Sequence, residues 1–131
     1  TVHGALAHSR GTDVDSRAPL DNVEPLTAVL GLLARGPRDR WGLETLVTLV
    51  ARKDRVSSDD RVTADSYAVL DLVGRVRPSE RTSLRVGLFN VLDEAYARWA
   101  NLQGLAADDA NAIALARASG RNVRVAFNFE F

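Results

Sequence analysis

The sequence predicts a mainly α-helical protein, an antiparallel bundle of about five helices around one long central helix. Apolar residues recur at spacings of three and four along several segments, and breaks containing glycine or proline separate these segments. A change to alternating apolar residues near the C-terminus adds a short β-strand. The expected organisation is a flexible N-terminal arm at 1–20, a helical bundle domain at 21–121 and a C-terminal strand at 122–131.

Composition narrows the class of protein. The chain has 131 residues, 46% of them hydrophobic, which is enough for the core of one domain. Seventeen basic and seventeen acidic residues cancel, which argues against a bilayer or an acidic substrate as partner. The absence of cysteine excludes disulfides and a cysteine-based zinc site. The sequence has no apolar run of about 20 residues, and its start lacks the basic residues followed by an apolar run that are typical of a signal peptide. We therefore expect a cytoplasmic protein whose first residue is exposed by loss of an initiator methionine.

The first twenty residues show no useful periodicity and are expected to become ordered only on a partner. His3 and His8, with Asp13 and Asp15 downstream, are the residues from which a metal site could be drawn. A metal site needs ligands held in place, and a flexible arm does not hold them. We therefore expect no metal and no cofactor.

Three helices are predicted before the central one. The first begins at Asp21 or Asn22 and ends at Gly36, where Pro37 prevents its continuation. The second follows after a short connection and ends in the charged run 52–55, so the two should form an antiparallel hairpin. The third carries the apolar residues between Tyr67 and Val76 and ends before Pro78.

The central helix is predicted over Ser79–Gly104, because Leu84, Leu88 and Trp99 belong to one stripe of helical spacing. At 1.5 Å per residue it would be about 38 Å long, enough for the shorter helices to pack along it. An alanine-rich fifth helix is expected at 107–119, with two aspartates capping its positive end.

The segment from Asn122 has the period of a β-strand with one apolar face. Four arrangements remain open for it: pairing with residues 2–7, docking on the bundle, capping the core of its own domain, or adding to a strand of another subunit. The last of these predicts the subunit-contact residues Val123, Val125, Phe127, Phe129 and Phe131.

Catalytic motifs are missing. The sequence has no GxSxG elbow, phosphate-binding loop, GxGxxG or HExxH motif. Asp93 lies beside an apolar stripe of the predicted central helix, but a structural ion pair with an arginine explains it better than an active-site acid does. We expect a non-enzymatic protein without catalytic residues.

Arginine supplies sixteen of the seventeen basic residues, and arginine binds phosphate through a two-pronged fork. The nucleic-acid-binding candidates are the clustered residues Arg35, Arg38, Arg40, Arg52 and Arg55. The run 116–121 also resembles the turn of a helix-turn-helix motif, although the alternation that follows it does not suit a reading helix.

The function expected from these features is a self-assembling structural subunit of coat, scaffold or filament type. Its terminal arm and C-terminal strand would contact neighbouring copies in a homo-oligomer, with enclosed nucleic acid as a candidate partner and no membrane. The alternative is a small helical binding module, such as an adaptor, an antitoxin or a helix-turn-helix-like regulator. An enzyme that uses carboxylates alone ranks third.

Overall fold

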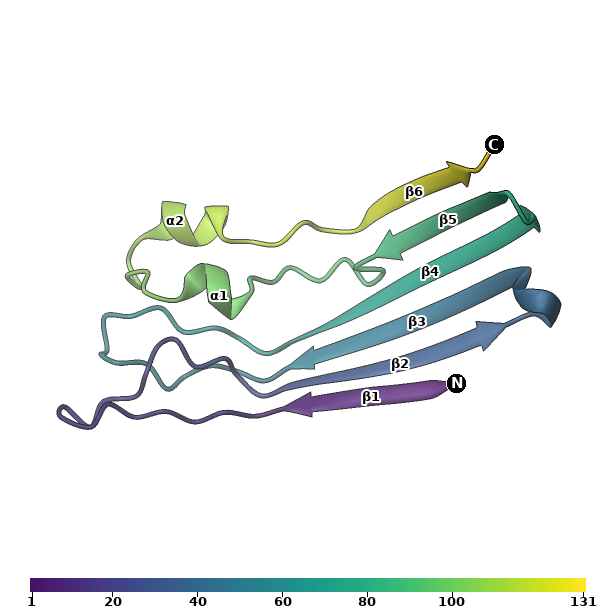
Figure 1. The fold of residues 1–131 in the computed structure, drawn as a ribbon. Helices are drawn as coiled ribbons and strands as arrows, with labels where there is room; N and C mark the ends of the chain where they lie inside the picture. The colour runs from purple at the N-terminus through teal and green to yellow at the C-terminus, as the bar shows by residue number, and fades with distance from the viewer.

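Six β-strands make up most of the regular structure of the chain in a computed structural model that describes residues 1–131. They form one antiparallel sheet in which spatial order follows chain order (Figure 1). The strands are β1 (Val2–Ala7), β2 (Thr27–Arg35), β3 (Trp41–Val50), β4 (Tyr67–Ser79), β5 (Thr82–Phe89) and β6 (Asn122–Phe129).

The predicted five-helix bundle is wrong. Helical structure is limited to α1 (Trp99–Leu102), α2 (Ala110–Leu115) and the 3₁₀ turn η1 (Pro37–Asp39). The predicted central helix Ser79–Gly104 is divided among the end of β4, β5, an irregular segment and α1. In β5, Leu84, Val86 and Leu88 occupy every second position, which is the spacing of a strand. Gly87 lies in the same segment and weakens a helix.

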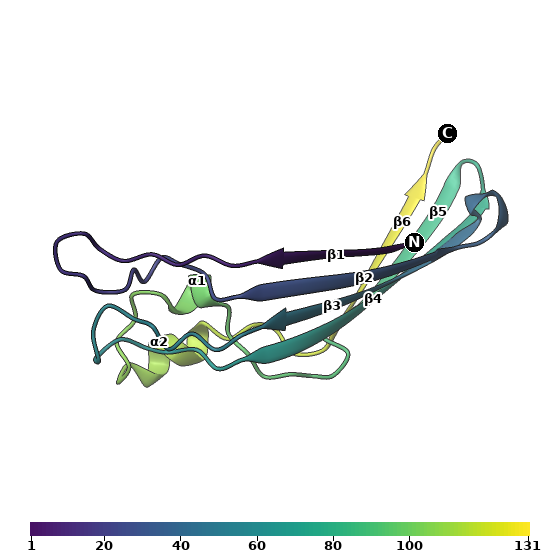
Figure 2. The ribbon, with the colours of Figure 1, turned by 90° about the horizontal axis from the view of Figure 1, so that it is seen from below.

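The two ends of the sheet differ in the length of their connections. Residues 36–40 and 80–81 make tight turns at one end, which we call the turn end. The segments 8–26, 51–66 and 90–121 connect strands at the other end, which we call the loop end. Figure 1 shows these segments gathered at the left with both α-helices, and Figure 2 shows the strong curvature of the sheet.

The sheet runs through all three ranges of the predicted domain organisation. β1 lies within 1–20 and pairs with β2 from Val2↔Leu32 to Ala7↔Thr27. β2 to β5 lie within 21–121, and β6 begins at Asn122 and pairs with β5 along its whole length. β1 and β6 form opposite edges of the sheet, so the N-terminal segment and the C-terminal strand do not pair with each other.

The hydrophobic core lies at the loop end rather than on the sheet. It consists of five buried residues from the connections: Val62, Ala64, Trp99, Leu102 and Ala116. Only 12 of the 131 residues are buried, and most strand residues with large apolar side chains keep substantial exposure. The sheet therefore presents its apolar side chains to its surroundings.

Candidate functional site

The register of the sheet sorts its side chains onto two faces. Because side chains alternate along a strand and directly paired residues share a face, the pairing assigns the strand residues to faces, except beyond the register shift between Val76 and Ser79 at the end of β4. We call one of these faces the outer face. Its residues are Val2, Gly4, Leu6, Ala28, Leu30, Leu32, Ala34, Trp41, Leu43, Thr45, Val47, Leu49, Ala68, Leu70, Leu72, Gly74, Val76, Thr82, Leu84, Val86, Leu88, Val123, Val125, Phe127 and Phe129.

The outer face carries no charged residue on any of the six strands, and its polar members are two threonines, Thr45 and Thr82. Many of its large side chains are exposed: Leu30 is 55% exposed and Val125 66%. Soluble monomers rarely expose an apolar surface that extends over a whole sheet. This face therefore needs an apolar environment.

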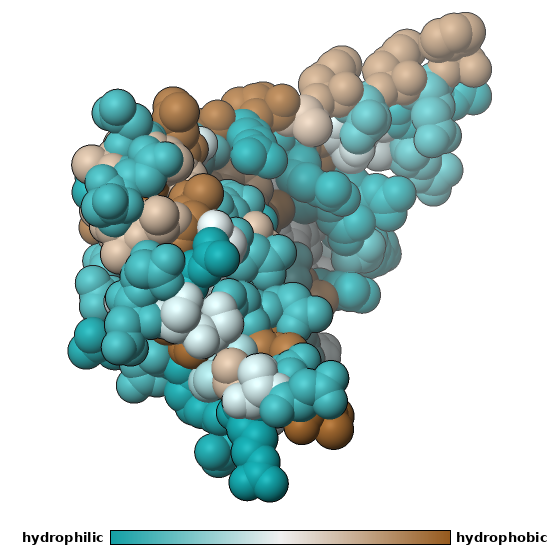
Figure 3. Space-filling view, turned by 90° about the vertical axis from the view of Figure 1, so that its left-hand side faces the viewer, coloured by the Kyte–Doolittle hydropathy of each residue, from teal (hydrophilic) through white to brown (hydrophobic).

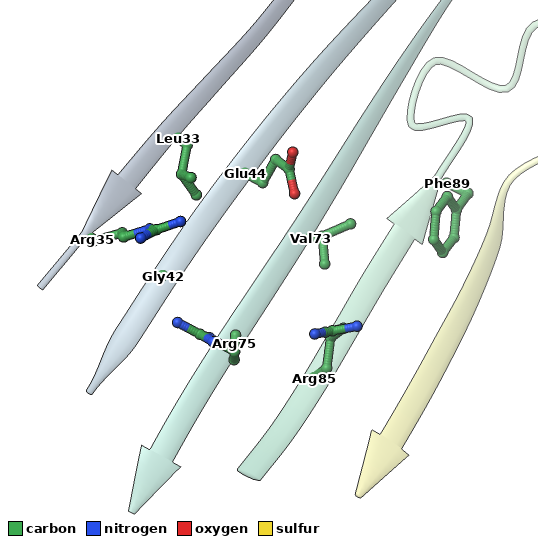
Figure 4. Close-up of a pocket in the computed structure, with 8 residues that line it drawn as sticks. All are labelled: Leu33, Arg35, Gly42, Glu44, Val73, Arg75, Arg85 and Phe89. Carbon is green, nitrogen blue, oxygen red and sulfur yellow. The ribbon is translucent and has the colours of Figure 1, made fainter. Parts of the chain in front are cut away.

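The opposite, inner face is mixed and carries the charges of the strands. A cavity of about 440 Å³ lies on it, lined by residues from β2 to β5 (Figure 4). Its lining residues are Leu33, Arg35, Gly42, Glu44, Val73, Arg75, Arg85 and Phe89.

Three arginines cross this cavity in one row. Arg35 pairs with Gly42, Gly42 pairs with Arg75, and Arg75 pairs with Arg85, so the four residues stand side by side on successive strands. Figure 4 shows the three arginine side chains at the same level of the sheet. Gly42 leaves open space between Arg35 and Arg75. Like charges on directly opposite residues destabilise a sheet, so this row favours an anionic group above it.

Asp39 supplies part of that negative charge from the β2–β3 turn. Its Oδ2 accepts a hydrogen bond from Arg75 at 2.6 Å and lies 3.6 Å from a guanidinium nitrogen of Arg77. The hydrogen bond from Arg75 holds the pKa of the Asp39 carboxyl below its usual range, although burial opposes the shift. Asp39 bonds only Arg75 and Arg77, so Arg35 and Arg85 have no carboxylate partner in the structure.

Asp21 joins the three long connections at the loop end. Its backbone oxygen accepts a hydrogen bond from the indole nitrogen of Trp99 at 2.6 Å. Its carboxylate accepts hydrogen bonds from the backbone nitrogen of Ser57 at 2.7 Å and from the Ser57 hydroxyl at 2.6 Å. Residues from 8–26, 51–66 and 90–121 are thus tied together at one point.

Lys53 adds a second link between the same connections. Its ammonium group donates to the backbone oxygen of Val23 at 2.8 Å and lies 5.2 Å from the centre of the Trp99 ring. Burial lowers the pKa of Lys53, while the nearby Asp21 carboxylate opposes the shift. These contacts hold the three connections against one another at the loop end.

The surface of the loop end is mostly hydrophilic, with hydrophobic side chains in scattered spots (Figure 3). Two of the most exposed apolar residues lie in its connections: Val14 is 90% exposed and Leu115, at the end of α2, is 88% exposed. Both side chains are therefore open to solvent on the surface of the loop end.

The structure separates the predicted nucleic-acid-binding arginines. Arg35 lies on the inner face, and Arg38 and Arg40 flank Asp39 in the β2–β3 turn. Arg52 and Arg55 follow β3 at the loop end, with the ten residues of that strand in between. The five residues therefore form no single surface.

The predicted subunit-contact residues lie on β6 or just beyond it. Val123, Val125, Phe127 and Phe129 belong to the outer face, and Phe131 is fully exposed beyond the strand. The backbone of β6 pairs with β5 of the same chain, so one of its two edges is already occupied.

Two residues singled out in the sequence have other surroundings than expected. Asp93 is exposed in the turn after β5, where its Oδ1 accepts a hydrogen bond from the backbone nitrogen of Arg121. His3 lies over Gly31 of β2, where a Cβ would collide with the imidazole. No group of three or more histidine, cysteine or acidic side chains is placed to hold a metal ion.

Sequence reasoning missed the inner-face residues Glu44, Arg75 and Arg85. Arg75 and Asp71 stand four apart in the segment predicted as the third helix, a spacing typical of a helix-surface ion pair. Both residues lie on the inner face of β4, where Asp71 bonds the backbone nitrogen of Asn90 instead. The alternation Trp41, Leu43, Thr45, Val47, Leu49 was the signal that could have revealed these strands.

The chain matches no protein-family model. It is similar to haemoglobin-haptoglobin-binding protein A of Haemophilus influenzae, with 25% identity over 140 residues, covering 90% of this chain and 13% of the relative. It is also similar to haemoglobin-haptoglobin utilization protein B of Neisseria meningitidis serogroup A, with 26% identity over 115 residues, covering 79% of this chain and 14% of the relative. The chain thus spans a small part of the length of the relatives it matches.

Among solved structures, the copper transporter OprC has the same fold as this chain. The TM-score is 0.86 at 24% identity, and the match covers 99% of this chain and 21% of OprC. No helix of the structure is both long and apolar enough to cross a membrane.

These findings overturn the function expected from the sequence. The fold is a β-sheet, the relatives are named for binding haemoglobin, and the structural neighbour is a transporter. A self-assembling coat, scaffold or filament subunit is therefore wrong, and so is a helical adaptor, antitoxin or helix-turn-helix regulator. The cytoplasmic location and the predicted partners, a homo-oligomer with nucleic acid and no membrane, are wrong as well, because the relatives are named for binding or utilising haemoglobin and the structural neighbour is named as a transporter.

Proposed function

We propose that the chain is a section of the wall of a membrane-embedded uptake receptor for haemoglobin or a haemoglobin complex. Its six strands cross a bacterial outer membrane as part of a β-barrel, with the outer face in lipid and the inner face toward a polar interior. The loop end projects from the membrane and contacts the protein cargo. This role involves binding and transport rather than catalysis.

The observation that carries the proposal is the absence of charge from the outer face of all six strands, opposite a charged inner face. Strands of transmembrane barrels alternate apolar-out and polar-in, and closed sheets are the only β-structures that satisfy their backbone groups in lipid. If a layer of protein covered this face, we would expect charged residues to be absent only from the few central strands that the layer covers. Here the pattern extends to the edge strands β1 and β6.

The length of the strands supports the same role. β3 has ten residues, which span about 30 Å when extended. At the tilt of about 40° found in transmembrane barrels, this length covers about 23 Å of membrane, close to the apolar band of about 25 Å. Trp41 and Phe129 lie on the outer face near the turn end, where aromatic side chains mark the membrane interface.

The unequal connections support the orientation. Outer-membrane barrels have short turns on the periplasmic side and long loops on the outside. The loop end would then face the medium, where a protein cargo arrives. The names of the relatives favour haemoglobin as that cargo.

Single-cysteine variants test the membrane position, because the chain has no cysteine of its own. Val47→Cys and Leu49→Cys should react slowly with a water-soluble maleimide in native membranes, and an attached fluorophore should be quenched by brominated lipids. Leu46→Cys and Thr48→Cys, on the inner face of the same strand, should escape the lipid quencher. Equal quenching at all four positions would contradict the proposed lipid contact.

Haemoglobin binding to cells that carry the full-length protein tests the cargo separately. Val14→Glu and Leu115→Glu should weaken binding, because each places a charge where an apolar contact is proposed. Asn111→Glu on α2 is the matched control and should bind as the wild type does. Unchanged binding by both apolar variants, with normal lipid quenching, would reject this surface while leaving the membrane role intact.

A further inference from the structure

A second cavity lies on the inner side near the loop end and shares one lining residue, Phe89, with the cavity over the arginine row. It has a volume of about 570 Å³ and is lined by β4, the end of β5, the start of β6, helix α1 and the segments that precede α1 and follow α2. Its basic lining residues are Arg98, Arg117 and Arg124, and its single carboxylate is Asp71. The lining therefore has a net positive charge.

None of the three arginines has an anionic partner. The ion pairs of the chain all involve Asp39 at the turn end, and no side-chain hydrogen bond uses Arg98, Arg117 or Arg124 as donor. Asp71 is engaged elsewhere, because its Oδ1 accepts a hydrogen bond from the backbone nitrogen of Asn90 at 2.8 Å. The Arg124 guanidinium lies 4.9 Å from the centre of the Phe89 ring, which fixes its position without neutralising it.

The backbone around this cavity is held by a buried asparagine. Asn90 is 2% exposed, and its amide nitrogen donates to the backbone oxygens of Glu94 at 2.9 Å and Ser119 at 3.4 Å. Its amide oxygen accepts from the backbone nitrogen of Glu94 at 2.9 Å. Asn90 thus ties the segment that leads to Arg98 to the segment that follows Arg117.

Backbone contacts complete the link. Ala97 and Arg117 form an antiparallel bridge, and the backbone nitrogen of Ala118 donates to the oxygen of Tyr96 at 2.9 Å. Arg98 and Arg117 are therefore placed together by neighbouring backbone, while Arg124 reaches the same cavity from β6. Three arginines from three parts of the chain thus line one cavity.

We propose that this cavity binds a small anion that carries two or more carboxylate or phosphate groups. The planar guanidinium matches both kinds of oxyanion with two parallel hydrogen bonds, and three guanidinium groups call for more than one anionic group. Tyr96, which stacks on Tyr67 with ring centres 4.4 Å apart, adds an aromatic wall to the cavity. The site is separate from the lipid-facing surface and from the exposed residues proposed to contact haemoglobin.

Calorimetry on the purified full-length protein tests this site, with citrate as the carboxylate probe and pyrophosphate as the phosphate probe. Arg98→Gln and Arg117→Gln should each weaken binding about ten- to a hundredfold, because each removes a charge-assisted pair of hydrogen bonds. Arg121→Gln is the matched control, since this neighbouring exposed arginine does not line the cavity. It should keep the wild-type affinity within about twofold.

The two probes separate the chemical sources. Binding of citrate alone identifies a carboxylate site, binding of pyrophosphate alone identifies a phosphate site, and binding of both identifies a general oxyanion site. Each of these results supports the proposal if Arg98→Gln and Arg117→Gln weaken binding and Arg121→Gln does not. Failure of both probes to bind at about 1 mM would overturn it. An equal loss in Arg121→Gln would also overturn it, because the attraction would then be non-specific.

Discussion

The sheet and the loop end of this chain hold their shape by different means. The sheet relies on backbone hydrogen bonds along five strand pairs, and no second layer of the chain covers its outer face, where many large side chains are exposed. The loop end has a small apolar core around Trp99, with side-chain hydrogen bonds to backbone through Asp21 and Lys53. The sheet satisfies its backbone groups within itself and leaves apolar side chains outside, as proteins do in lipid. The loop end buries apolar side chains in a core, as proteins do in water.

This difference shows that hydrophobic residues have opposite roles in the two regions. At the loop end, Trp99 is 3% exposed and supports the fold by being buried. On the sheet, exposed side chains such as Val125 contribute most to stability when the surroundings are apolar. Substitutions should therefore affect one region and leave the other unchanged.

The largest effect is expected from Trp99→Ala. It removes a buried side chain that also donates to Asp21, so it should destabilise the loop end by about 3–5 kcal/mol. Hydrogen exchange should show lost protection in 51–66 and 90–121, with the strand amides unchanged. Trp41→Ala, at the other tryptophan, should leave loop-end exchange as it is. Equal loss of protection in the strands would mean that the two regions unfold as one unit.

A charge on the outer face should have the next largest effect. Val47→Arg places a cation near the middle of β3 and should cost about 2–4 kcal/mol of unfolding free energy in a bilayer. Denaturant unfolding in lipid vesicles measures it. Thr48→Arg on the inner face is the matched control and should cost much less. A similar cost for both variants would remove the distinction between the faces.

Asp21→Ala should have an intermediate effect confined to the loop end. It removes the carboxylate that accepts two hydrogen bonds from Ser57, worth about 1.5–3 kcal/mol, and keeps the backbone oxygen that binds Trp99. Limited proteolysis should detect faster cleavage within 51–66. Asp15→Ala, at an exposed aspartate whose carboxylate accepts no hydrogen bond, should be cleaved at the wild-type rate.

The smallest effect is expected from Asp39→Asn at the turn end. The pKa of Asp39 is lowered in the folded protein, so its stabilising contribution is present above the unfolded pKa of about 3.9 and is lost as pH falls through the folded value. Amide exchange in the β2–β3 turn should be faster in the variant at neutral pH and should converge with wild type in acid. A difference that persists unchanged in acid would exclude the Arg75 ion pair as its cause.

The helical prediction failed because both faces of several strands carry apolar residues. In β3, Leu46 and Val50 of the inner face join Leu43 and Val47 of the outer face, and together they match helical spacing as well as strand spacing. The interpretation also assumed that apolar stripes face a protein core. Glycine at 31, 42, 74 and 87 lies inside four strands and was a signal against long helices.

The residues of the candidate sites could not be grouped from the sequence without knowing which strands pair and in what register. Arg35, Arg75 and Arg85 are far apart in the chain, and only the strand register places them in one row. The segment from Asn122 showed clear alternation because its inner face is polar, and it forms β6. Burial of Trp99 was expected on a long helix, whereas the structure encloses it among connections.

The strand order has a consequence for how such a chain can change over time. Each strand pairs only with the strands before and after it in the chain, so no connection crosses another. A change in one connection therefore does not alter the register between strands elsewhere in the sheet. A long connection at the loop end can therefore lengthen, shorten or be exchanged without shifting the ladder beneath it. The tight turns have no such freedom, because they set the register of their hairpins. Sequence variation, including any that changes the proposed cargo contact, should therefore accumulate at the loop end while the sheet stays constant.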